Sequence, residues 1–284
     1  MQSTYPSSNG SLVTILGATG FIGSHLVKKV EELGKRVFAP GRDEDLKGKD
    51  LGDVIYCIGL TSDFREYPLE TVDAHVCHLS WVLGNCDFRS LLYLSSTRIY
   101  KGNNAPAREE DGIQLSPMDP DNLYNASKTM GESLCFSCGK KTRVARISNV
   151  YGNDFESRNF LSAIIKGAVT EGKVIVREPP DTERDYISVQ DVVSSLIRIA
   201  IQGKQRLYNL ASGVNVSNLE LTQRIAELTG CQIVFDPAVS PKCSPRISID
   251  RIRSEFNFRP ATVLEELGGV IDSYKTRVAK QPPE

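Results

Sequence analysis

Three closely spaced glycines near the N-terminus, Gly17, Gly20 and Gly23, constrain the fold of this chain more than any other feature. The apolar run 12–16 precedes them and is typical of a buried strand. Residues 21–33 follow with apolar side chains at helical spacing. The glycines therefore lie on a strand-to-helix turn, where backbone N–H groups and the positive end of a helix can bind a dinucleotide pyrophosphate.

A second apolar strand, residues 36–40, follows at the spacing of a βαβ unit. The end of that strand faces the adenosine ribose in such a fold, where an acid favours NAD and an arginine accommodates the 2′-phosphate of NADP. Gly41 occupies the position of the acid and Arg42 follows it. We therefore expect NADP as the cofactor, while Asp43 leaves NAD open.

Composition narrows the class of protein. The chain has 284 residues, 40% hydrophobic and 24% charged, which suits a large α/β domain with or without a smaller lobe. The net charge of −1 argues against a nucleic-acid partner. No apolar run has the length of a membrane span. Met1–Gly10 lacks the regions of a signal peptide, so we expect a loose tail and a cytoplasmic protein.

The cysteines indicate reduced thiols. There are seven, an odd number, scattered through segments that read as strands and helices. Cys135 and Cys138 form one CxxC pair, but a zinc site needs two more ligands nearby. The chain has only three histidines, so we expect no metal site.

The segment after Arg42 is short. Too few residues separate it from the next apolar strand, 53–59, for a full helix and strand, so one βα unit is shortened or missing. The end of that strand, Ile58–Thr61, is expected near the cofactor ribose. Residues 67–83 are predicted to form a helix, with one apolar face made of Leu69, Val72, Val76, Leu79 and Leu83.

A further strand, residues 90–94, delivers Ser95–Thr97 at its carboxyl end, where ligands of open α/β sheets bind. Residues 101–122 are rich in Pro, Asn, Asp and Gly and indicate a long loop over this edge. Tyr124 and Lys128 then open another helix and, being four residues apart, share a face.

The pair Tyr124 and Lys128 has chemical content. A tyrosine hydroxyl normally titrates near pH 10, and we expect the nearby ammonium to lower that pKa. The tyrosine can then exchange a proton with a sugar hydroxyl or carbonyl while hydride moves to or from nicotinamide. Ser96 would hold the same oxygen.

Together these segments resemble the extended short-chain dehydrogenase/reductases, the family of NAD(P)-dependent nucleotide-sugar epimerases and dehydratases. The resemblance runs from Val13 to about Pro260. The matching pieces, in order, are residues 17–23 (GATGFIG), 94–100 (LSSTRIY), 124–128 (YNASK), 146–152 (RISNVYG), 184–192 (RDYISVQDV) and 208–213 (YNLASG).

The resemblance implies a role for each matching position. The catalytic residues would be Ser96, Tyr124 and Lys128, with Thr97 as a neighbouring candidate. The cofactor-binding residues would be Gly17, Thr19, Gly20, Phe21, Ile22, Gly23, Arg42, Ile58, Gly59, Tyr124, Lys128 and Ser148. The substrate-binding residues would be Ser96, Thr97, Asn149, Asn159, Arg184 and Arg246. The two arginines suit a nucleoside diphosphate, which arginine can bind bidentately.

Departures from the family pattern narrow the range of expected activities. Dehydratases of the family carry an Asp-Glu pair after the catalytic Ser/Thr, where this chain has Thr97 and Arg98, so the sequence argues against a dehydratase. The short segment after Arg42 and the modest length resemble the family's 4-keto-sugar reductases, which use NADPH. His75 occupies the place of a usual asparagine, and neither it nor Arg98 has an assigned role.

The expected architecture is a Rossmann-type doubly wound parallel sheet with a small C-terminal substrate-binding lobe. The NAD(P)-binding domain is predicted over residues 11–152, with 186–212 returning to it. The nucleotide-sugar lobe is predicted over 153–185 and 213–284. Helices are expected at 160–170, 189–201, 217–228, 250–256 and 262–279, and short strands at 173–176 and 206–211.

Three functions remain open at this point. The first is a reductase that transfers hydride at a sugar carbon, C4, with Tyr124 as acid/base. The second is a nucleotide-sugar 4-epimerase that keeps NAD tightly bound. The third is a non-catalytic NAD(P)-binding sensor, which the presence of Ser96, Tyr124 and Lys128 disfavours. The resemblance also allows a homodimer through the 67–83 and Tyr124 helices.

Overall fold

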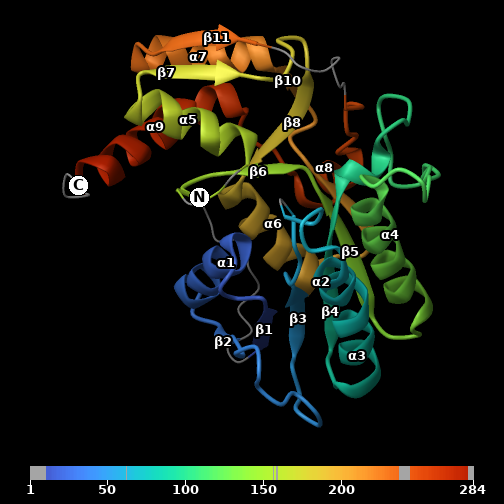
Figure 1. Cartoon of the computed structure of the whole chain (residues 1–284). Coiled ribbons are helices and arrows are strands. Elements are labelled where there is room, and N and C mark those ends of the chain that lie inside the picture. Colours follow the sequence, from blue (N-terminus) through green and yellow to red (C-terminus); the bar gives the residue numbers. More distant parts are fainter. Residues whose placement is uncertain (1–10, 62, 156, 158, 237–243, 281–284) are drawn as a thin grey trace.

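The computed structural model describes residues 11–61, 63–155, 157, 159–236 and 244–280. The predicted tail, Met1–Gly10, lies outside them. At the centre is a six-stranded parallel sheet in the order β2-β1-β3-β4-β5-β9 (Figure 1). Its strands are β1 (Leu12–Leu16), β2 (Arg36–Phe38), β3 (Asp53–Tyr56), β4 (Ser90–Ser96), β5 (Thr142–Ile147) and β9 (Leu207–Leu210).

The strand order confirms the shortened βα unit. β2 and β3 pair with opposite edges of β1, so the chain crosses the sheet between them. Residues 39–52 make that crossing without a helix or an assigned strand, apart from an isolated bridge at Asp50. The sheet therefore ends at β2, next to the strand that carries the glycine turn.

Helices cover both faces of the sheet (Figure 1), which confirms the doubly wound Rossmann-type fold. α1 (Phe21–Glu32) and α6 (Val189–Gln202) share one hydrophobic cluster with the sheet. α3 (His78–Asn85) and α4 (Asn122–Ser137) contribute to a second cluster with the same strands. The branched apolar side chains of β1, β3, β4 and β5 supply both clusters, because alternate residues of a strand point to opposite faces.

The predicted helix 67–83 forms with a different buried face. It consists of α2 (Pro68–Val72), a π-helical turn η1 (Asp73–Cys77) and α3. The wider turn shifts the face that meets the sheet. Leu69 is 80% exposed, whereas Ala74 and His75 are buried. The prediction that Leu69 belongs to the apolar face is therefore wrong.

A smaller group of elements lies above the carboxyl edge of the main sheet (Figure 1). Its two sheets are β10-β8-β6 (Asn215–Ser217, Glu183–Ser188, Asn149–Tyr151) and β11-β7 (Gln232–Phe235, Lys173–Val176). Their partners are α5 (Phe160–Thr170), α7 (Asn218–Thr229) and α9 (Val263–Lys280), which share a hydrophobic cluster with them. Gly230 ends α7 with a φ of 74°, which favours glycine.

One helix of the C-terminal region packs elsewhere. α8 (Asp250–Phe256) places Ile252 and Phe256 in the cluster formed by the main sheet and α6. The predicted lobe boundary at 213–284 therefore includes a helix that packs with the main sheet, and the domain ranges stay a prediction. No helix in the described part of the chain has both the length and the apolar content needed to cross a membrane.

Candidate active site

The three glycines of the β1–α1 turn meet different constraints. A Cβ on Gly17, whose φ is +85°, would lie 2.9 Å from the backbone nitrogen of Ile58. A Cβ on Gly23 would collide with the carbonyl oxygen of Gly17. At Gly20 the nearest atom to a Cβ is 3.5 Å away, an ordinary contact. Packing within the protein thus requires glycine at positions 17 and 23 but not at position 20.

Gly20 is instead suited to the close approach of a ligand. It is the N-cap of α1, and no side chain caps the first N–H groups of that helix. The first turn of α1 also holds no acidic residue. Such an end binds an anion through backbone N–H groups and the helix dipole. These residues fit the pyrophosphate of a dinucleotide, and Thr19, Phe21 and Ile22 lie on the same turn.

The end of β3 joins the glycine turn to α4. Ile58 lies against Gly17, as described above. One residue later, a Cβ on Gly59 would lie 2.9 Å from Nε2 of His75 and 3.3 Å from Nζ of Lys128. Positions expected from the sequence to bind cofactor therefore adjoin across the carboxyl edge of β1 and β3.

Tyr124 is buried, with 4% of its surface exposed. The side chains of Ser96 and Thr61 lie near the Tyr124 hydroxyl and favour its ionised form. Burial raises the pKa of Tyr124, while these two neighbours and the charge of Arg98 lower it. The net result is a pKa of Tyr124 above its ordinary value. The prediction that the Lys128 ammonium lowers this pKa is therefore wrong for the protein without bound ligands. Desolvation of the phenolate outweighs the nearby charge.

Lys128 lies one helical turn further along α4, also buried. Its Nζ donates to the carbonyl oxygen of Leu94, 2.9 Å away, and lies 5.9 Å from the centre of the Tyr124 ring. Burial lowers the pKa of Lys128 from 10.5 to about 7. Burial of the charged ammonium therefore destabilises the folded protein, because the ammonium loses its hydration.

Because burial of the Lys128 ammonium destabilises the fold, we expect Lys128→Met to be more stable than the wild type, by an amount that depends on pH. Below pH 7 the lysine is charged in both the folded and the unfolded chain, so the full penalty of its burial is present. Between pH 7 and 10.5 the folded protein releases the proton first, and wild-type stability rises with pH. We expect the variant to melt about 3–6 °C higher at pH 6.

The check is a pair of thermal melts at pH 6 and pH 9.5. The gain should shrink at the higher pH, and the affinity for NADPH should fall at both. Equal melting temperatures of the variant and wild type at pH 6 would contradict the buried charge.

His75, which the sequence left without a role, packs against the tyrosine. Its ring meets the Tyr124 ring edge-on at 5.3 Å between centres, and its Nδ1 lies 2.9 Å from Oγ of Ser127. Burial lowers the pKa of His75 to about 2, and the charge of Lys128 adds to this effect. The Leu60 backbone has a smaller effect that raises the pKa. Nε2 has no hydrogen-bond partner in the described part of the chain. A neutral imidazole thus helps to hold the Tyr124 ring.

A buried ion pair anchors α4 to the sheet. Arg146 on β5 bonds Glu132 on α4 at 2.7 Å and the Tyr100 hydroxyl at 2.7 Å. Tyr100 in turn donates to Asn209 on β9 at 2.7 Å. Removing one member of such a pair leaves an uncompensated buried charge. This network fixes the helix that carries Tyr124 and Lys128.

Asp185 joins three of the sequence pieces singled out above. Its carboxylate accepts from the hydroxyls of Ser148 at 2.6 Å and Ser212 at 2.9 Å, and from the backbone N–H of Gly213 at 2.7 Å. Asn149 donates its amide to the Asp185 carbonyl oxygen at 2.8 Å. The Ser148 hydroxyl, expected at the cofactor, is thus committed to Asp185.

The remaining predicted substrate residues lie apart from this network. Thr97 begins the 3₁₀ turn η2 (Thr97–Tyr100), and its hydroxyl is 3.5 Å from the Ile147 carbonyl oxygen. Arg184 forms an ion pair with Glu178, so a diphosphate would have to compete with that carboxylate. Asn159 is the exposed N-cap of α5.

The two outlying arginines are solvent-exposed. Arg42 lies in the segment after β2. Arg246 accepts a backbone hydrogen bond from Ala107 at 2.8 Å, and its side chain lines a surface hollow with Arg108 and Arg253. Within the described ranges, no three His, Cys, Asp or Glu side chains are grouped to hold a metal ion.

Comparison with known proteins decides the family. The model of the NAD-dependent epimerase/dehydratase family matches residues 46–211, more than half of the chain. The chain belongs to this family. The expectation drawn from the glycine turn, Ser96 and the Tyr124–Lys128 pair is thereby confirmed at the level of the family.

Among the relatives of this epimerase/dehydratase family member are two reductases. The dTDP-4-dehydro-6-deoxy-D-allose reductase of Streptomyces bikiniensis is 28% identical, over 90% of this chain and 95% of its own length. The GDP-6-deoxy-D-mannose reductase of Pseudomonas aeruginosa is 26% identical, over 94% and 98%. The solved structure of RMD from Pseudomonas aeruginosa with NADPH superposes with a TM-score of 0.79 at 22% identity, covering 94% of this chain and 99% of that one.

Two contacts of Tyr124 in this family member escaped the sequence analysis. Thr61 lies near the tyrosine hydroxyl and lowers its pKa, and the Phe64 ring lies 5.4 Å from the tyrosine ring, between centres. Thr61 follows the end of β3, and β3 pairs with β4, which ends at Ser96. The position of Thr61 could therefore have been predicted from the pairing of these two strands. Phe64 comes from a loop, and no periodic pattern marks it.

Proposed function

We propose that this protein is an NAD(P)-dependent nucleotide-sugar oxidoreductase that acts at C4 of the sugar, working as a 4-keto-sugar reductase. One observation carries the proposal: Tyr124 and Lys128 are both buried, one turn apart on α4, and Ser96 interacts with the Tyr124 hydroxyl. They lie where the glycine turn and the end of β3 adjoin. Relatives named as nucleotide-sugar reductases support the direction of the reaction.

Each side chain has a definite task in this reaction. NAD(P)H held on the glycine turn would supply a hydride to the sugar carbonyl carbon. Tyr124 gives its proton to the carbonyl oxygen, and Ser96 donates a hydrogen bond that holds that oxygen in place. The raised pKa of Tyr124 keeps it protonated and ready to donate at neutral pH. Lys128 contributes positive charge and a donor for the cofactor ribose.

We favour NADP over NAD because Arg42 is exposed after β2, where a 2′-phosphate would lie. The test begins with denaturing the purified protein and identifying any released nucleotide. Tightly held NAD⁺ would make the protein a 4-epimerase, because an epimerase recycles its cofactor within one turnover. Binding of neither dinucleotide would overturn the oxidoreductase proposal.

Arg42→Gln should then weaken NADPH binding by about tenfold and leave NADH binding unchanged, because only NADPH carries the 2′-phosphate. Fluorescence titrations of both cofactors measure this. Lys47→Gln, which removes another exposed cation of the same segment, is the matched control and should change neither affinity. A loss shared equally by NADPH and NADH would place Arg42 away from the phosphate.

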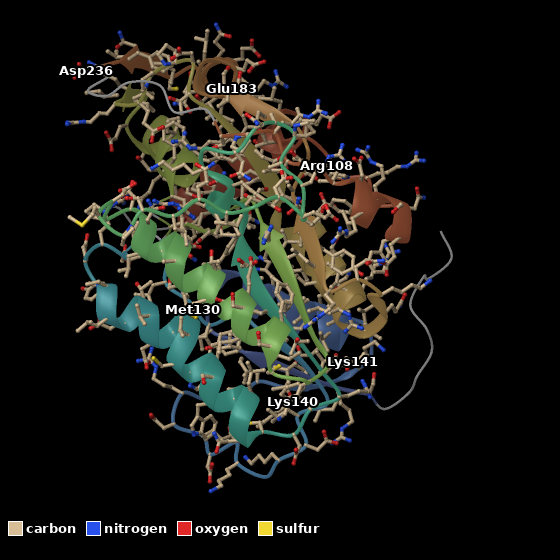
Figure 2. The ribbon with its side chains drawn as sticks, turned by 90° about the vertical axis from the view of Figure 1, so that its right-hand side faces the viewer. Arg108, Met130, Lys140, Lys141, Glu183 and Asp236 are labelled. Carbon is tan, nitrogen blue, oxygen red and sulfur yellow. The ribbon has the colours of Figure 1, made fainter. Side chains whose placement is uncertain are left out.

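We also infer a homodimer. Trp81 on α3 and Met130 on α4 are large apolar side chains that are 39% and 54% exposed on neighbouring helices. Figure 2 shows Met130 on the outer side of α4, beside the helices that precede β4. Light scattering should give about twice the chain mass of 31.3 kDa, and the mass of a single chain would contradict the dimer.

A further inference from the structure

A positive charge lies next to Tyr124 that the reaction above does not use. Arg98 belongs to η2, directly after β4, and its backbone N–H donates to Oγ of Ser96 at 3.2 Å. Its guanidinium carbon is 5.4 Å from the centre of the Tyr124 ring and 4.8 Å from that of Phe64. Two aromatic rings thus hold the guanidinium group beside the two hydroxyls that would face the reacting carbonyl.

The charge of Arg98 is only partly balanced. Its nearest carboxylate, Asp121, is 3.7 Å away from Nη2, beyond hydrogen-bonding distance. The same carboxylate is bound closely by Arg65, through Nε at 2.7 Å and Nη2 at 2.6 Å. The neighbouring Asp119 pairs with Lys101 at 3.6 Å. Three cations therefore share two carboxylates.

Arg98 is also partly withdrawn from water. Its side chain is 34% exposed, and burial lowers its pKa, an effect that Asp121 opposes. Among the described residues, the structure gives its guanidinium no hydrogen-bond acceptor. A partly desolvated guanidinium with unused donors is suited to a planar oxyanion, which it can bind through two parallel hydrogen bonds.

The position of Arg98 indicates which anion this is, given the proposed function on which this step rests. The diphosphate of a nucleotide-sugar is attached at C1, across the ring from C4. An anionic group next to the carbon that meets Tyr124 must therefore belong to the sugar itself. The substituent that neighbours C4 and can carry a planar charge is a carboxylate at C6.

We propose that Arg98 binds a carboxylate of the sugar, so that the preferred substrates are nucleotide-linked uronic acids. The Phe64 and Tyr124 rings hold the guanidinium group in place, and Asp121 holds Arg65 beside it without occupying the Arg98 donors. Discrimination against the neutral sugar comes from leaving those donors unpaired.

The test compares matched ligands with the full-length protein in the presence of NADP⁺. The pairs are UDP-glucose with UDP-glucuronic acid, dTDP-glucose with dTDP-glucuronic acid, and GDP-mannose with GDP-mannuronic acid, each titrated by calorimetry. Within the pair whose nucleotide the protein accepts, we expect the uronic acid to bind about tenfold more tightly than its neutral partner. Arg98→Gln should abolish this preference while the affinity for the neutral sugar stays within about twofold.

Two further variants guard the interpretation. Arg98→Lys keeps the charge but not the paired donors and should retain part of the preference. Lys101→Gln removes a neighbouring exposed cation and should leave the preference intact. Thermal melts of each variant check the fold.

Two outcomes overturn the inference while the proposed function stands. The first is that the wild type binds both members of a pair with equal affinity. The second is that Arg98→Gln loses affinity equally for both members, which would mean that Arg98 acts on Tyr124 or on the diphosphate. If no nucleotide-sugar of the three bases binds, the proposed function itself fails, and the inference fails with it.

Discussion

Tyr124→Phe is expected to lower kcat by about 10³-fold and to leave the Kd for NADPH within about twofold. The substitution removes only the hydroxyl that Ser96 and Thr61 neighbour. The ring contacts with Phe64 and His75, at 5.4 and 5.3 Å between centres, are kept. Steady-state assays and cofactor titrations of the same preparation separate the loss of the acid/base from a loss of binding.

The control is Tyr67→Phe, which removes the hydroxyl of an exposed tyrosine before α2 and should change neither quantity. Retained turnover in Tyr124→Phe would remove the tyrosine from the chemistry. A cofactor-dependent output of the protein that survives the substitution would then favour the sensor over the enzyme.

Alanine substitutions at Gly23 and Gly20 should fail in opposite ways. At Gly23 the added Cβ meets the carbonyl oxygen of Gly17, so the fold itself should lose about 2–3 kcal/mol. At Gly20 the added Cβ meets nothing closer than 3.5 Å, so the protein should fold normally. It should nevertheless bind NADPH at least about tenfold more weakly, because the Cβ occupies the space of the pyrophosphate.

Thermal melts and NADPH titrations of both variants measure these effects. Gly84→Ala is the matched control, because a Cβ there meets nothing within 4 Å and alanine favours a helix over glycine. NADPH binding by Gly20→Ala at wild-type affinity would show that no pyrophosphate lies on this turn.

Local patterns in the sequence were sufficient for much of the fold. Helices α5 and α8 and strand β7 begin and end where apolar spacing and flanking residues predict. The missing βα unit follows from counting residues between Arg42 and β3. The order of Ser96, Tyr124 and Lys128 along the chain was enough to bring them to one edge, because the carboxyl ends of parallel strands meet there.

What the sequence did not predict depends on tertiary contacts. The π-helical turn at Asp73–Cys77 adds a residue to a helix without changing its apolar composition, so the exposure of Leu69 could not be anticipated. The sign of the pKa shift of Tyr124 is set by burial, which spacing along a helix does not reveal. The surroundings of Arg98 come from segments far apart in the chain, around Phe64 and Asp121.

The most direct test of hydride transfer at this site uses sugars labelled with deuterium at C4. The protein is incubated with NADP⁺ or NAD⁺ and labelled UDP-, dTDP- or GDP-linked hexoses and uronic acids, then quenched in acid during turnover. We predict that mass spectrometry will find deuterium on the nicotinamide ring, and that Tyr124→Phe will suppress it. Retention of all label on every sugar, with both nicotinamides unlabelled, would contradict hydride transfer at C4.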